Sequence, residues 1–425
     1  MKHCKSIRHL MELLIGLGVI LIPSAQAANY TQLYSFKGDQ YSDGKYPYAP
    51  LVLFGGNTLR GTTEQGGKGN LSGGTVFDVP ICQSGHCREV QLHSFPKNHQ
   101  NDGDYPRAGL YYDAARTAFY GTTTGGGQFG WGDVFEMSHA FTEKQLYSFR
   151  GVGHDGATPY AGLISDAKGQ NLYGTTSGAG LNGFGTIFVV NTGNGRERTL
   201  YNFTNAGGDG ANPLSGLTLD ATGQNLYGTT RNGGFFGFGT VFQLNLATGV
   251  ETVLYSFAGN ANGDGANPVA GLVEDGAGNF YGTTVYGGTG GCNDGQGDLG
   301  CGTVFALNRT VGAYAVLYSF SGGADGKYPI CSGSLVWHSG NLYGTTFAGG
   351  NGWGTVFVVN ASTGMENPLY PFGARPDGTN PYAGLTANSG SVIYLFGTTL
   401  YGGAGPCNDG QGDIGCGTVF RLGPF

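Results

Sequence analysis

Seven aspartates at regular spacing are the first candidates for chemistry in the sequence. Each begins an Asp-Gly pair with a proline three or four residues beyond it, and together they are Asp43, Asp102, Asp155, Asp209, Asp264, Asp325 and Asp377. An aspartate in this position can cap its own turn with its side chain, a role that needs no ligand. Carboxylates gathered together could instead bind cations or supply the acid and base that cleave a glycosidic bond. His154 adjoins Asp155, so we take Asp102, Asp155 and His154 as candidate ligand-binding residues.

A second recurring position carries an aromatic residue directly before a Gly-Thr-Val-Phe block or a close variant of it. The residues at this position are Trp131, Phe184, Phe238 and Trp353, with Cys301 and Cys416 in two further repeats and Gly73 in the first. Exposed rings would form flat apolar platforms suited to sugar faces, whereas buried rings would pack between neighbouring elements. The exchange with cysteine favours packing, and both interpretations stay open for Trp131, Phe184, Phe238 and Trp353 as ligand-binding residues.

A ten-residue loop between two cysteines occurs twice, at residues 292–301 and 407–416, almost unchanged. The oxygen ligands of Asp294, Asp298, Asp409 and Asp413 could hold calcium. The loop lacks the alternating acids and terminal glutamate of a helix-loop-helix calcium site, which favours a disulfide-stapled turn. Closing such a loop contributes roughly 2.5 to 3 kcal/mol in the chain-entropy model, so the disulfide alone explains the cysteines.

Other catalytic signatures are missing from the sequence. No histidine pair has the helical spacing of a zinc site, and no glycine-rich match precedes a helix as a phosphate or dinucleotide loop would. Departures from the repeat are few: Arg60 replaces a tyrosine, Asp133 replaces a threonine, Arg107 follows Pro106, and Cys331 stands where alanine or tyrosine is usual. A single site in a symmetric protein needs such local differences, although drift in a redundant scaffold also produces them.

The elements that position these residues follow from a repeat of about 54 residues. Seven phenylalanines end an aromatic strand in each copy and lie 52 to 63 residues apart: Phe36, Phe95, Phe149, Phe203, Phe257, Phe320 and Phe372. Each is followed by the Asp-Gly turn, a short strand, a strand of the Leu-Tyr-Gly-Thr-Thr type, a glycine-rich loop and a strand of the Gly-Thr-Val-Phe type. Four antiparallel strands per repeat predict the blade of a β-propeller, and seven repeats predict seven blades.

The two ends of the repeat array predict how the ring closes. The array begins with an isolated aromatic strand at residues 32–36 and ends with a Gly-Thr-Val-Phe strand that has no successor. Pairing them would complete the last blade and remove two exposed sheet edges. In such a ring the Asp-Gly loops and the glycine-rich loops share one face, where we expect ligands to be met. A β-solenoid is the structural alternative, but its coils are usually shorter and need caps.

Composition and the first residues indicate an exported protein. Lys2, Lys5 and Arg8 precede an apolar run at residues 13–22, and Ala25-Gln26-Ala27 follows, so we predict a signal peptide at residues 1–27 and one propeller domain at 28–425. The mature chain has 18 basic and 27 acidic residues, a net charge of −9, which disfavours nucleic acid as a partner. Three close cysteine pairs predict disulfides, namely 82 with 87, 292 with 301 and 407 with 416, and leave Cys331 as a buried thiol. No later segment is long and apolar enough for membrane insertion.

The repeated blocks resemble the tandem GloVer repeat family. The resemblance covers nearly the whole mature chain and implies a bacterial surface or exported protein. Members of that family are joined to various C-terminal sorting anchors, whereas this chain ends at Pro424-Phe425 directly after a strand. The resemblance implies no reaction and no catalytic residues.

These observations predict a secreted or periplasmic all-β binding protein. We expect a monomer that presents a glycan- or protein-binding face, with calcium as the cofactor the acidic loops could hold. The alternative is a carbohydrate-active hydrolase or lyase on the same scaffold, because a fold alone does not decide function.

Overall fold

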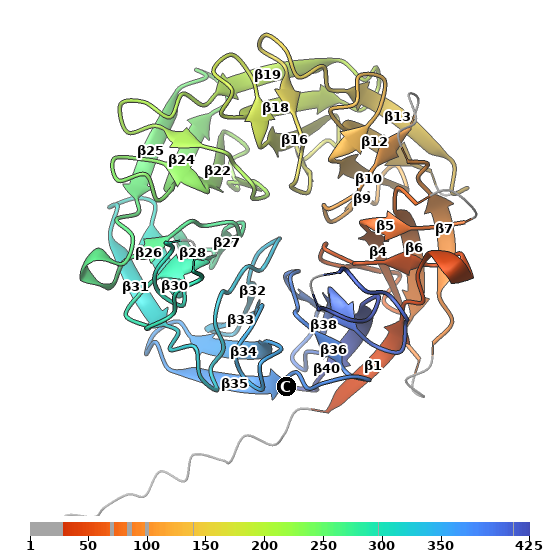
Figure 1. Cartoon of the computed structure of the whole chain (residues 1–425). Helices are drawn as coiled ribbons and strands as arrows, with labels where there is room; N and C mark the ends of the chain where they lie inside the picture. Colours follow the sequence, from red (N-terminus) through yellow and green to blue (C-terminus); the bar gives the residue numbers. More distant parts are fainter. Residues whose placement is uncertain are drawn as a thin grey trace, which may run out of the picture.

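The computed structural model describes residues 29–68, 72–82, 87–97, 102–138, 140–295, 297–410 and 412–425. Seven four-stranded antiparallel sheets stand side by side in a closed ring around a central axis (Figure 1). The prediction of an all-β, seven-bladed propeller is therefore confirmed. The predicted signal peptide at residues 1–27 lies outside the described residues.

Blades 1 to 6 are four-stranded meanders whose first strand lies innermost and whose last strand lies outermost (Figure 1). Blade 1 contains β3 (Val52–Phe54), β4 (Thr58–Thr63), β6 (Thr75–Pro80) and β7 (Val90–Ser94); blade 2 contains β9 (Tyr111–Asp113), β10 (Ala118–Thr123), β12 (Asp133–Met137) and β13 (Glu143–Ser148). Blade 3 contains β15 (Ile164–Ser165), β16 (Asn171–Thr176), β18 (Thr186–Asn191) and β19 (Glu197–Asn202); blade 4 contains β21 (Thr218–Leu219), β22 (Asn225–Thr230), β24 (Thr240–Asn245) and β25 (Glu251–Ser256). Blade 5 contains β27 (Val273–Glu274), β28 (Asn279–Thr284), β30 (Thr303–Asn308) and β31 (Tyr314–Ser319); blade 6 contains β32 (Val336–His338), β33 (Asn341–Thr346), β34 (Thr355–Asn360) and β35 (Glu366–Pro371).

Blade 7 is built from both ends of the described chain. It contains β37 (Thr386–Ala387), β38 (Leu395–Thr399) and β40 (Thr418–Leu422), and its outermost strand is β1 (Tyr30–Ser35). Strand β1 pairs with β40 in antiparallel register, with Tyr30 opposite Leu422. The predicted closure is confirmed: β40 becomes an inner strand of blade 7, and β1 takes the outer-edge position that the fourth strand holds in the other blades.

The core explains why the repeat keeps a glycine inside its most buried strand. In blade 3, Gly174 of β16 lies directly opposite Phe188 of β18, and a Cβ on Gly174 would meet the Phe188 ring at 2.6 Å. The same phenylalanine contacts Phe149 at the end of the preceding blade, with ring centroids 5.0 Å apart in an edge-to-face arrangement. Buried aromatic pairs of this kind recur between all neighbouring blades, as in Phe203 with Phe242. The glycine therefore makes room for the rings that join one blade to the next.

The paired threonines add hydrogen bonds within and between blades. In blade 4, the Thr229 hydroxyl donates to the Ala270 carbonyl of the next blade at 3.0 Å, and Thr230 shares a hydrogen bond of 2.8 Å with Thr240. Both hydroxyls are buried, so these bonds satisfy groups that would otherwise be costly to enclose. The recurring Thr-Thr pair therefore fixes the radial position of each blade.

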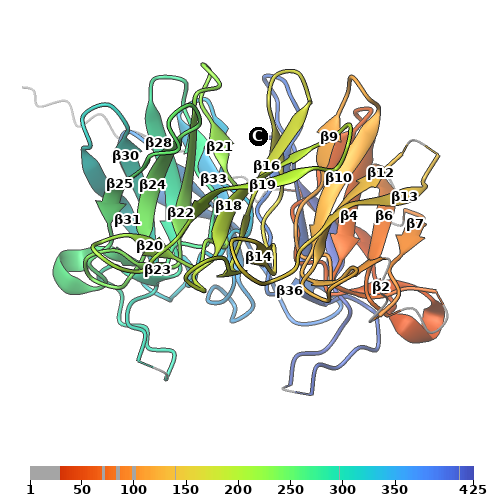
Figure 2. The same ribbon diagram turned by 90° about the horizontal axis from the view of Figure 1, so that it is seen from above.

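The Asp-Gly loop and the glycine-rich loop of each blade are held together by a short ribbon on one face of the ring. The ribbons pair β2 (Gly44–Lys45) with β5 (Gln65–Gly66), β8 (Gly103–Asp104) with β11 (Gly125–Gly126), β14 (Gly156–Ala157) with β17 (Gly178–Ala179), β20 (Gly210–Ala211) with β23 (Asn232–Gly233), β26 (Gly265–Ala266) with β29 (Tyr286–Gly287), and β36 (Gly378–Thr379) with β39 (Tyr401–Gly402). In blade 6 a single bridge joins Lys327 to Ala348. The ribbons lie together at the lower face in Figure 2, and we call this face the loop face. Two short 3-10 helices, η1 (Asp39–Tyr41) and η2 (Ala261–Gly263), lie in Asp-Gly loops.

Three disulfides join Cys82 to Cys87, Cys292 to Cys301 and Cys407 to Cys416, as predicted. Cys331 is a buried free thiol, and burial raises its pKa. Within the described residues, no helix has the length and apolar character needed to cross a membrane.

Candidate functional site

Six of the seven recurring aspartates hold their loops in place by accepting hydrogen bonds from a tyrosine hydroxyl and from backbone amides, and we call this set of contacts the latch. In blade 3, Asp155 accepts hydrogen bonds from the Tyr147 hydroxyl at 2.9 Å, from the Arg150 amide at 2.7 Å and from the Gly156 amide at 2.8 Å. The same pattern of a tyrosine hydroxyl and two backbone amides holds Asp43, Asp209, Asp264, Asp325 and Asp377, with small local variations. An aspartate here caps its turn and ties it to the outer strand of the previous blade, which is what the simpler interpretation of the sequence expects.

Two of the predicted ligand-binding residues need separate description. Asp102 faces His93 in place of a tyrosine, with 3.3 Å between His93 Nε2 and Asp102 Oδ2. His154 is exposed, and its carbonyl accepts a hydrogen bond from the Thr199 hydroxyl at 2.9 Å. His154 thus lies on the loop beside Asp155, while Asp155 itself is engaged in the latch.

The four aromatic residues at the second recurring position lie one per blade on the loop face. Trp131 is 49% exposed and Phe238 is 38% exposed, whereas Phe184 and Trp353 are half-buried. A Cβ on Gly151 would lie 2.8 Å from the Trp131 ring, and one on Gly259 would lie equally close to Phe238. These rings therefore cover the glycines at the start of the next Asp-Gly loop. The disulfide takes the same place in other blades, where Cys292 and Cys301 lie against Gly322.

The two acidic loops, residues 292–301 and 407–416, extend from the loop face as hairpins, seen in teal and blue at the bottom of Figure 2. The Asp298 amide donates to Asp294 Oδ1 at 3.2 Å, and the Asp413 amide donates to Asp409 Oδ1 at 3.2 Å. Each hairpin therefore uses one of its aspartates to cap the turn. The calcium expected at Asp294, Asp298, Asp409 and Asp413 stays a prediction.

The residue after the recurring proline of each repeat forms a third ring, and six of these seven residues line one cavity near the axis of the propeller. These residues are Tyr48, Arg107, Tyr160, Leu214, Val269, Ile330 and Tyr382. The residue before each proline has a φ between 54° and 60° in every blade, and its backbone amide donates to the residue at the aromatic or cysteine position. This left-handed backbone, which asparagine tolerates well, turns the chain toward the channel. We call the seven residues the mouth ring.

The mouth ring is divided into two arcs of different chemistry. Blades 7, 1, 2 and 3 contribute Tyr382, Tyr48, Arg107 and Tyr160, whereas blades 4, 5 and 6 contribute Leu214, Val269 and Ile330. Tyr48 and Tyr382 meet edge to face with centroids 4.9 Å apart. A symmetric fold thus carries an asymmetric mouth, with aromatic and basic groups on one side and aliphatic groups on the other.

Arg107 is held rigidly at the centre of the polar arc. Its guanidinium lies 4.9 Å from the Tyr48 ring centroid and 5.1 Å from that of Tyr160, and Nη1 donates to the Tyr160 hydroxyl at 2.9 Å. Nε donates to Glu64 Oε1 at 2.7 Å, and Glu64 itself is only 5% exposed. Burial raises the pKa of Glu64, and the Arg107 charge opposes that rise. Four groups fix this guanidinium before any ligand arrives.

A cavity of about 510 Å³ opens at the mouth ring. Its lining includes Ser177, Asn212, Arg231, Asn232 and Ser332, besides six residues of the mouth ring. Arg231 is exposed, and no ion pair joins it to another described residue. The described lining holds two guanidinium groups and no carboxylate, and Arg107 is ion-paired with Glu64 behind the lining. Arg231 therefore supplies the positive charge of this cavity on a chain with net charge −7. Its chemistry suits an anionic ligand with flat apolar faces.

Sequence reasoning found only part of this site. Arg107 was recognisable as a departure from the repeat, whereas Tyr48, Tyr160, Arg231 and Tyr382 were not singled out. The sequence could have identified these residues by their position, because each follows the recurring proline. Residues at that position must lie at equivalent places in the seven blades even though their types differ. The predicted residues Trp131, Phe238 and His154 lie on the same face but outside the described lining of the cavity.

Comparison with known proteins places the repeat in a family. A model of the Gloeobacter/Verrucomicrobia repeat matches residues 15–170 and 155–299, which together span more than half of the sequence. The chain belongs to this repeat family. A search of curated proteins found no match.

Solved structures similar to this family member show its fold alone. An oligogalacturonate lyase in complex with manganese is 11% identical, with 94% of this chain and 93% of that chain covered and a TM-score of 0.53. The oligogalacturonate lyase of Vibrio parahaemolyticus is 10% identical, with 94% of each chain covered and a TM-score of 0.51. A nidogen/laminin complex chain is 15% identical over 74% of this chain and 93% of that chain, with a TM-score of 0.45. The two lyases share the propeller architecture with this chain, and an architecture alone assigns no function.

Proposed function

We propose that this protein is an exported, non-catalytic propeller that binds an acidic glycan at the mouth ring. The observation that carries the proposal is the pair of arginines, Arg107 and Arg231, on a cavity whose described lining holds no carboxylate. A guanidinium matches the planar geometry of a carboxylate and can bond it through two N–H groups. A uronic acid residue supplies that carboxylate together with a ring whose faces suit tyrosine.

Size and rigidity support a small oligosaccharide as the ligand. A volume of about 510 Å³ lies in the range of about 300 to 1,000 Å³ usual for small-molecule sites. Arg107 is already ordered by Glu64, Tyr48 and Tyr160, so binding need not order it. Such preorganisation lowers the entropic cost of association.

Export is part of the proposal. Three disulfides indicate folding in an oxidising compartment, where extracellular or periplasmic glycans are met. The signal peptide predicted at residues 1–27 supports the same route.

The residues that line the cavity favour glycan binding over glycan hydrolysis. Hydrolysis of a glycosidic bond usually needs two carboxyl groups flanking it, and no carboxyl group is among the described lining residues. A lyase reaction on a uronate would release an unsaturated product. Incubation of the protein with each oligosaccharide that binds therefore separates the two functions.

Calorimetric titration with matched neutral and uronate-containing oligosaccharides tests the proposal. We expect the uronates to bind and their neutral counterparts to bind at least about tenfold more weakly, because a charged hydrogen bond contributes about 1.5 to 3 kcal/mol. Arg231→Ser introduces the residue that blade 3 carries at the equivalent position, Ser177, and should weaken uronate binding by about tenfold or more. Arg196→Ser removes an exposed arginine from the turn between β18 and β19, at the opposite end of the blade, and should leave binding unchanged. Equal binding by all three proteins would refute the proposal.

A further inference from the structure

The contact between the outer strands of blades 1 and 2 differs from the corresponding contact in the other blades. Elsewhere a tyrosine hydroxyl donates to the latch aspartate, as Tyr147 does to Asp155. Here β7 carries His93 at the tyrosine position, and an imidazole takes the place of the phenol beside Asp102. Imidazole is a metal ligand and phenol in this arrangement is a hydrogen-bond donor, so the replacement changes what the position can do.

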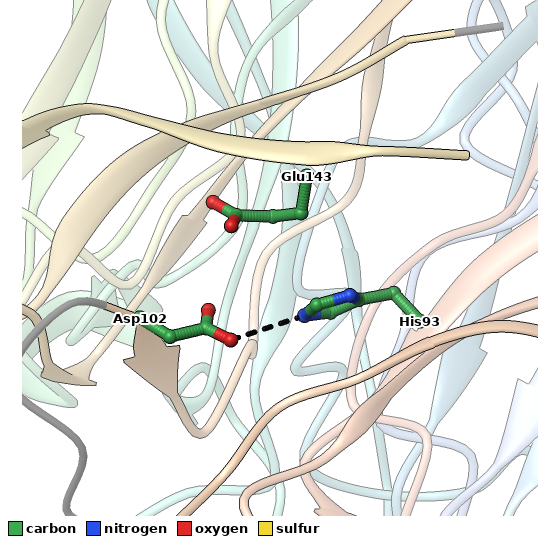
Figure 3. A group of neighbouring side chains, drawn as sticks. All are labelled: His93, Asp102 and Glu143. Atoms are coloured by element: carbon green, nitrogen blue, oxygen red, sulfur yellow. Dashed lines mark ion pairs between the residues drawn. The ribbon is translucent and has the colours of Figure 1, made fainter. Parts of the chain in front are cut away.

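A third ligand group completes a cluster at this contact. Glu143, the first residue of β13, turns its carboxyl group toward His93 and Asp102 (Figure 3). One ligand atom from each of the three side chains lies within 4.8 Å of the other two. The side chains of His93 and Asp102 are 20% and 15% exposed, so the cluster is largely enclosed yet reachable from solvent.

Each of the three residues presents a buried ligand atom without a hydrogen bond to any residue that the structure describes. His93 Nε2, Asp102 Oδ1 and Glu143 Oε1 are all buried, and none of them makes a hydrogen bond with a described residue. Apart from the 3.3 Å approach of Asp102 Oδ2 to His93 Nε2, these atoms are unsatisfied, and buried polar atoms are nearly always satisfied, which favours a shared partner such as an ion. An ion bound between them would satisfy all three together.

The charges around the cluster also favour a cation. Asp133, which replaces the threonine of the repeat, is fully buried nearby and adds another acidic group. Among the ion pairs of the described residues, no lysine or arginine is joined to Asp102, Asp133 or Glu143.

We propose that His93, Asp102 and Glu143 bind one divalent first-row transition-metal ion, of the kind represented by Zn²⁺ and Mn²⁺. One imidazole nitrogen and two carboxylate oxygens suit these ions, whereas Ca²⁺ prefers an all-oxygen shell of six to eight ligands. Three protein ligands leave a position for water. The ion ties the outer strand of blade 1 to that of blade 2, and this role is independent of glycan binding at the mouth ring.

Titration of the untagged, metal-free protein with ZnCl₂, MnCl₂ and CaCl₂ tests the proposal, with bound metal counted by elemental analysis and unfolding followed by calorimetry. We expect one Zn²⁺ or Mn²⁺ ion per chain at this site and a melting temperature that rises on loading, since a ligand of the native state stabilises it. His93→Tyr restores the residue of the other blades and should fold normally, lose that ion and lose the thermal shift. Glu143→Gln should weaken binding at least about tenfold.

The neighbouring contact between blades 2 and 3 supplies the matched controls. Glu197→Gln changes the glutamate at the position equivalent to Glu143 and should leave metal binding unchanged. Tyr147→His places an imidazole beside Asp155 and Glu197 and should add a second bound ion. The proposal would be overturned by any of three results: equal metal binding by the wild type and His93→Tyr, a preference of the site for Ca²⁺, or no metal binding at all.

Discussion

Two rings of residues on the loop face use the same repeat in opposite ways. The latch aspartates keep one residue type in all seven blades. Local donors occupy their carboxylates in every blade except blade 2, where Asp102 faces His93. The mouth ring keeps its backbone, with the left-handed residue before proline, but carries arginine, tyrosine and three aliphatic residue types. In a repeat protein, a polar residue that recurs in every repeat therefore indicates a structural role. A position whose place in the fold is fixed but whose residue type varies indicates a surface that can bind a ligand selectively. The exception at His93 follows the same rule, because it is a local change at an otherwise constant contact.

The largest effect that we predict is the loss of folding stability when the aspartate of one latch is replaced. Asp264 accepts hydrogen bonds from the hydroxyls of Tyr255 and Tyr314 at 2.9 and 2.7 Å and from the amides of Ala258 and Gly265 at 2.7 Å. Asp264→Ala leaves four donors without their acceptor, and we expect the free energy of unfolding to fall by about 3 to 5 kcal/mol in denaturant titrations. Asp298→Ala, in the projecting hairpin, is the control and should change it by less than about 1 kcal/mol. Similar losses in both variants would mean that the latch has no special structural role.

A smaller effect concerns the glutamates that lie beside the latch aspartates. Burial first, and then the charge of Asp209, raise the pKa of Glu251 to about 8, while Glu89 and Glu366 are raised to about 8 by burial and by Asp43 and Asp325. A folded-state pKa above the unfolded value of about 4.3 means that the native protein binds these protons more tightly. The stabilisation is complete below about pH 4.3 and is lost as the pH rises toward about 8. The melting temperature should therefore be higher at about pH 5 than at about pH 8.5.

Glu251→Gln sharpens this prediction because glutamine imitates the neutral carboxyl group. At about pH 8.5 the variant should be more stable than the wild type by about 1 kcal/mol, a value reduced for the partial exposure of the side chain. At about pH 5 the two proteins should unfold alike. A wild-type stability that increases from the lower to the higher pH would contradict the account.

A last prediction separates the aromatic residues of the loops from those of the mouth ring. Trp131 covers Gly151 and lies outside the described lining of the cavity, so Trp131→Ala should leave uronate binding unchanged and cost less than about 2 kcal/mol of stability. Tyr160→Ala removes a ring that contacts Arg107 and should weaken binding by about tenfold. Calorimetric titration measures both. Loss of binding in Trp131→Ala alone would move the ligand to the loop platforms considered from the sequence.

The fold was predictable because each recurring block of the repeat corresponds to one strand or one turn of a blade. The seven blades followed from the period of the repeat, and the pairing of the closing strands Tyr30–Ser35 and Thr418–Leu422 followed from the two ends of the repeat array. The three disulfides followed from cysteines close in sequence. The contents of the two sites did not, because His93 and Glu143 are fifty residues apart in the sequence and meet only when blades 1 and 2 pack. The mouth ring was not predicted because its residues differ in type from blade to blade, whereas the repeat was recognised from residues that are the same in most blades.

A crystal structure with the tightest-binding uronate oligosaccharide tests the central claim most directly. The account predicts a carboxylate within hydrogen-bonding distance of Arg231 or Arg107, with a sugar ring lying between the tyrosine arc and the aliphatic arc of the mouth ring. Sugar density over Trp131 and Phe238, or at the opposite end of the channel, would contradict it.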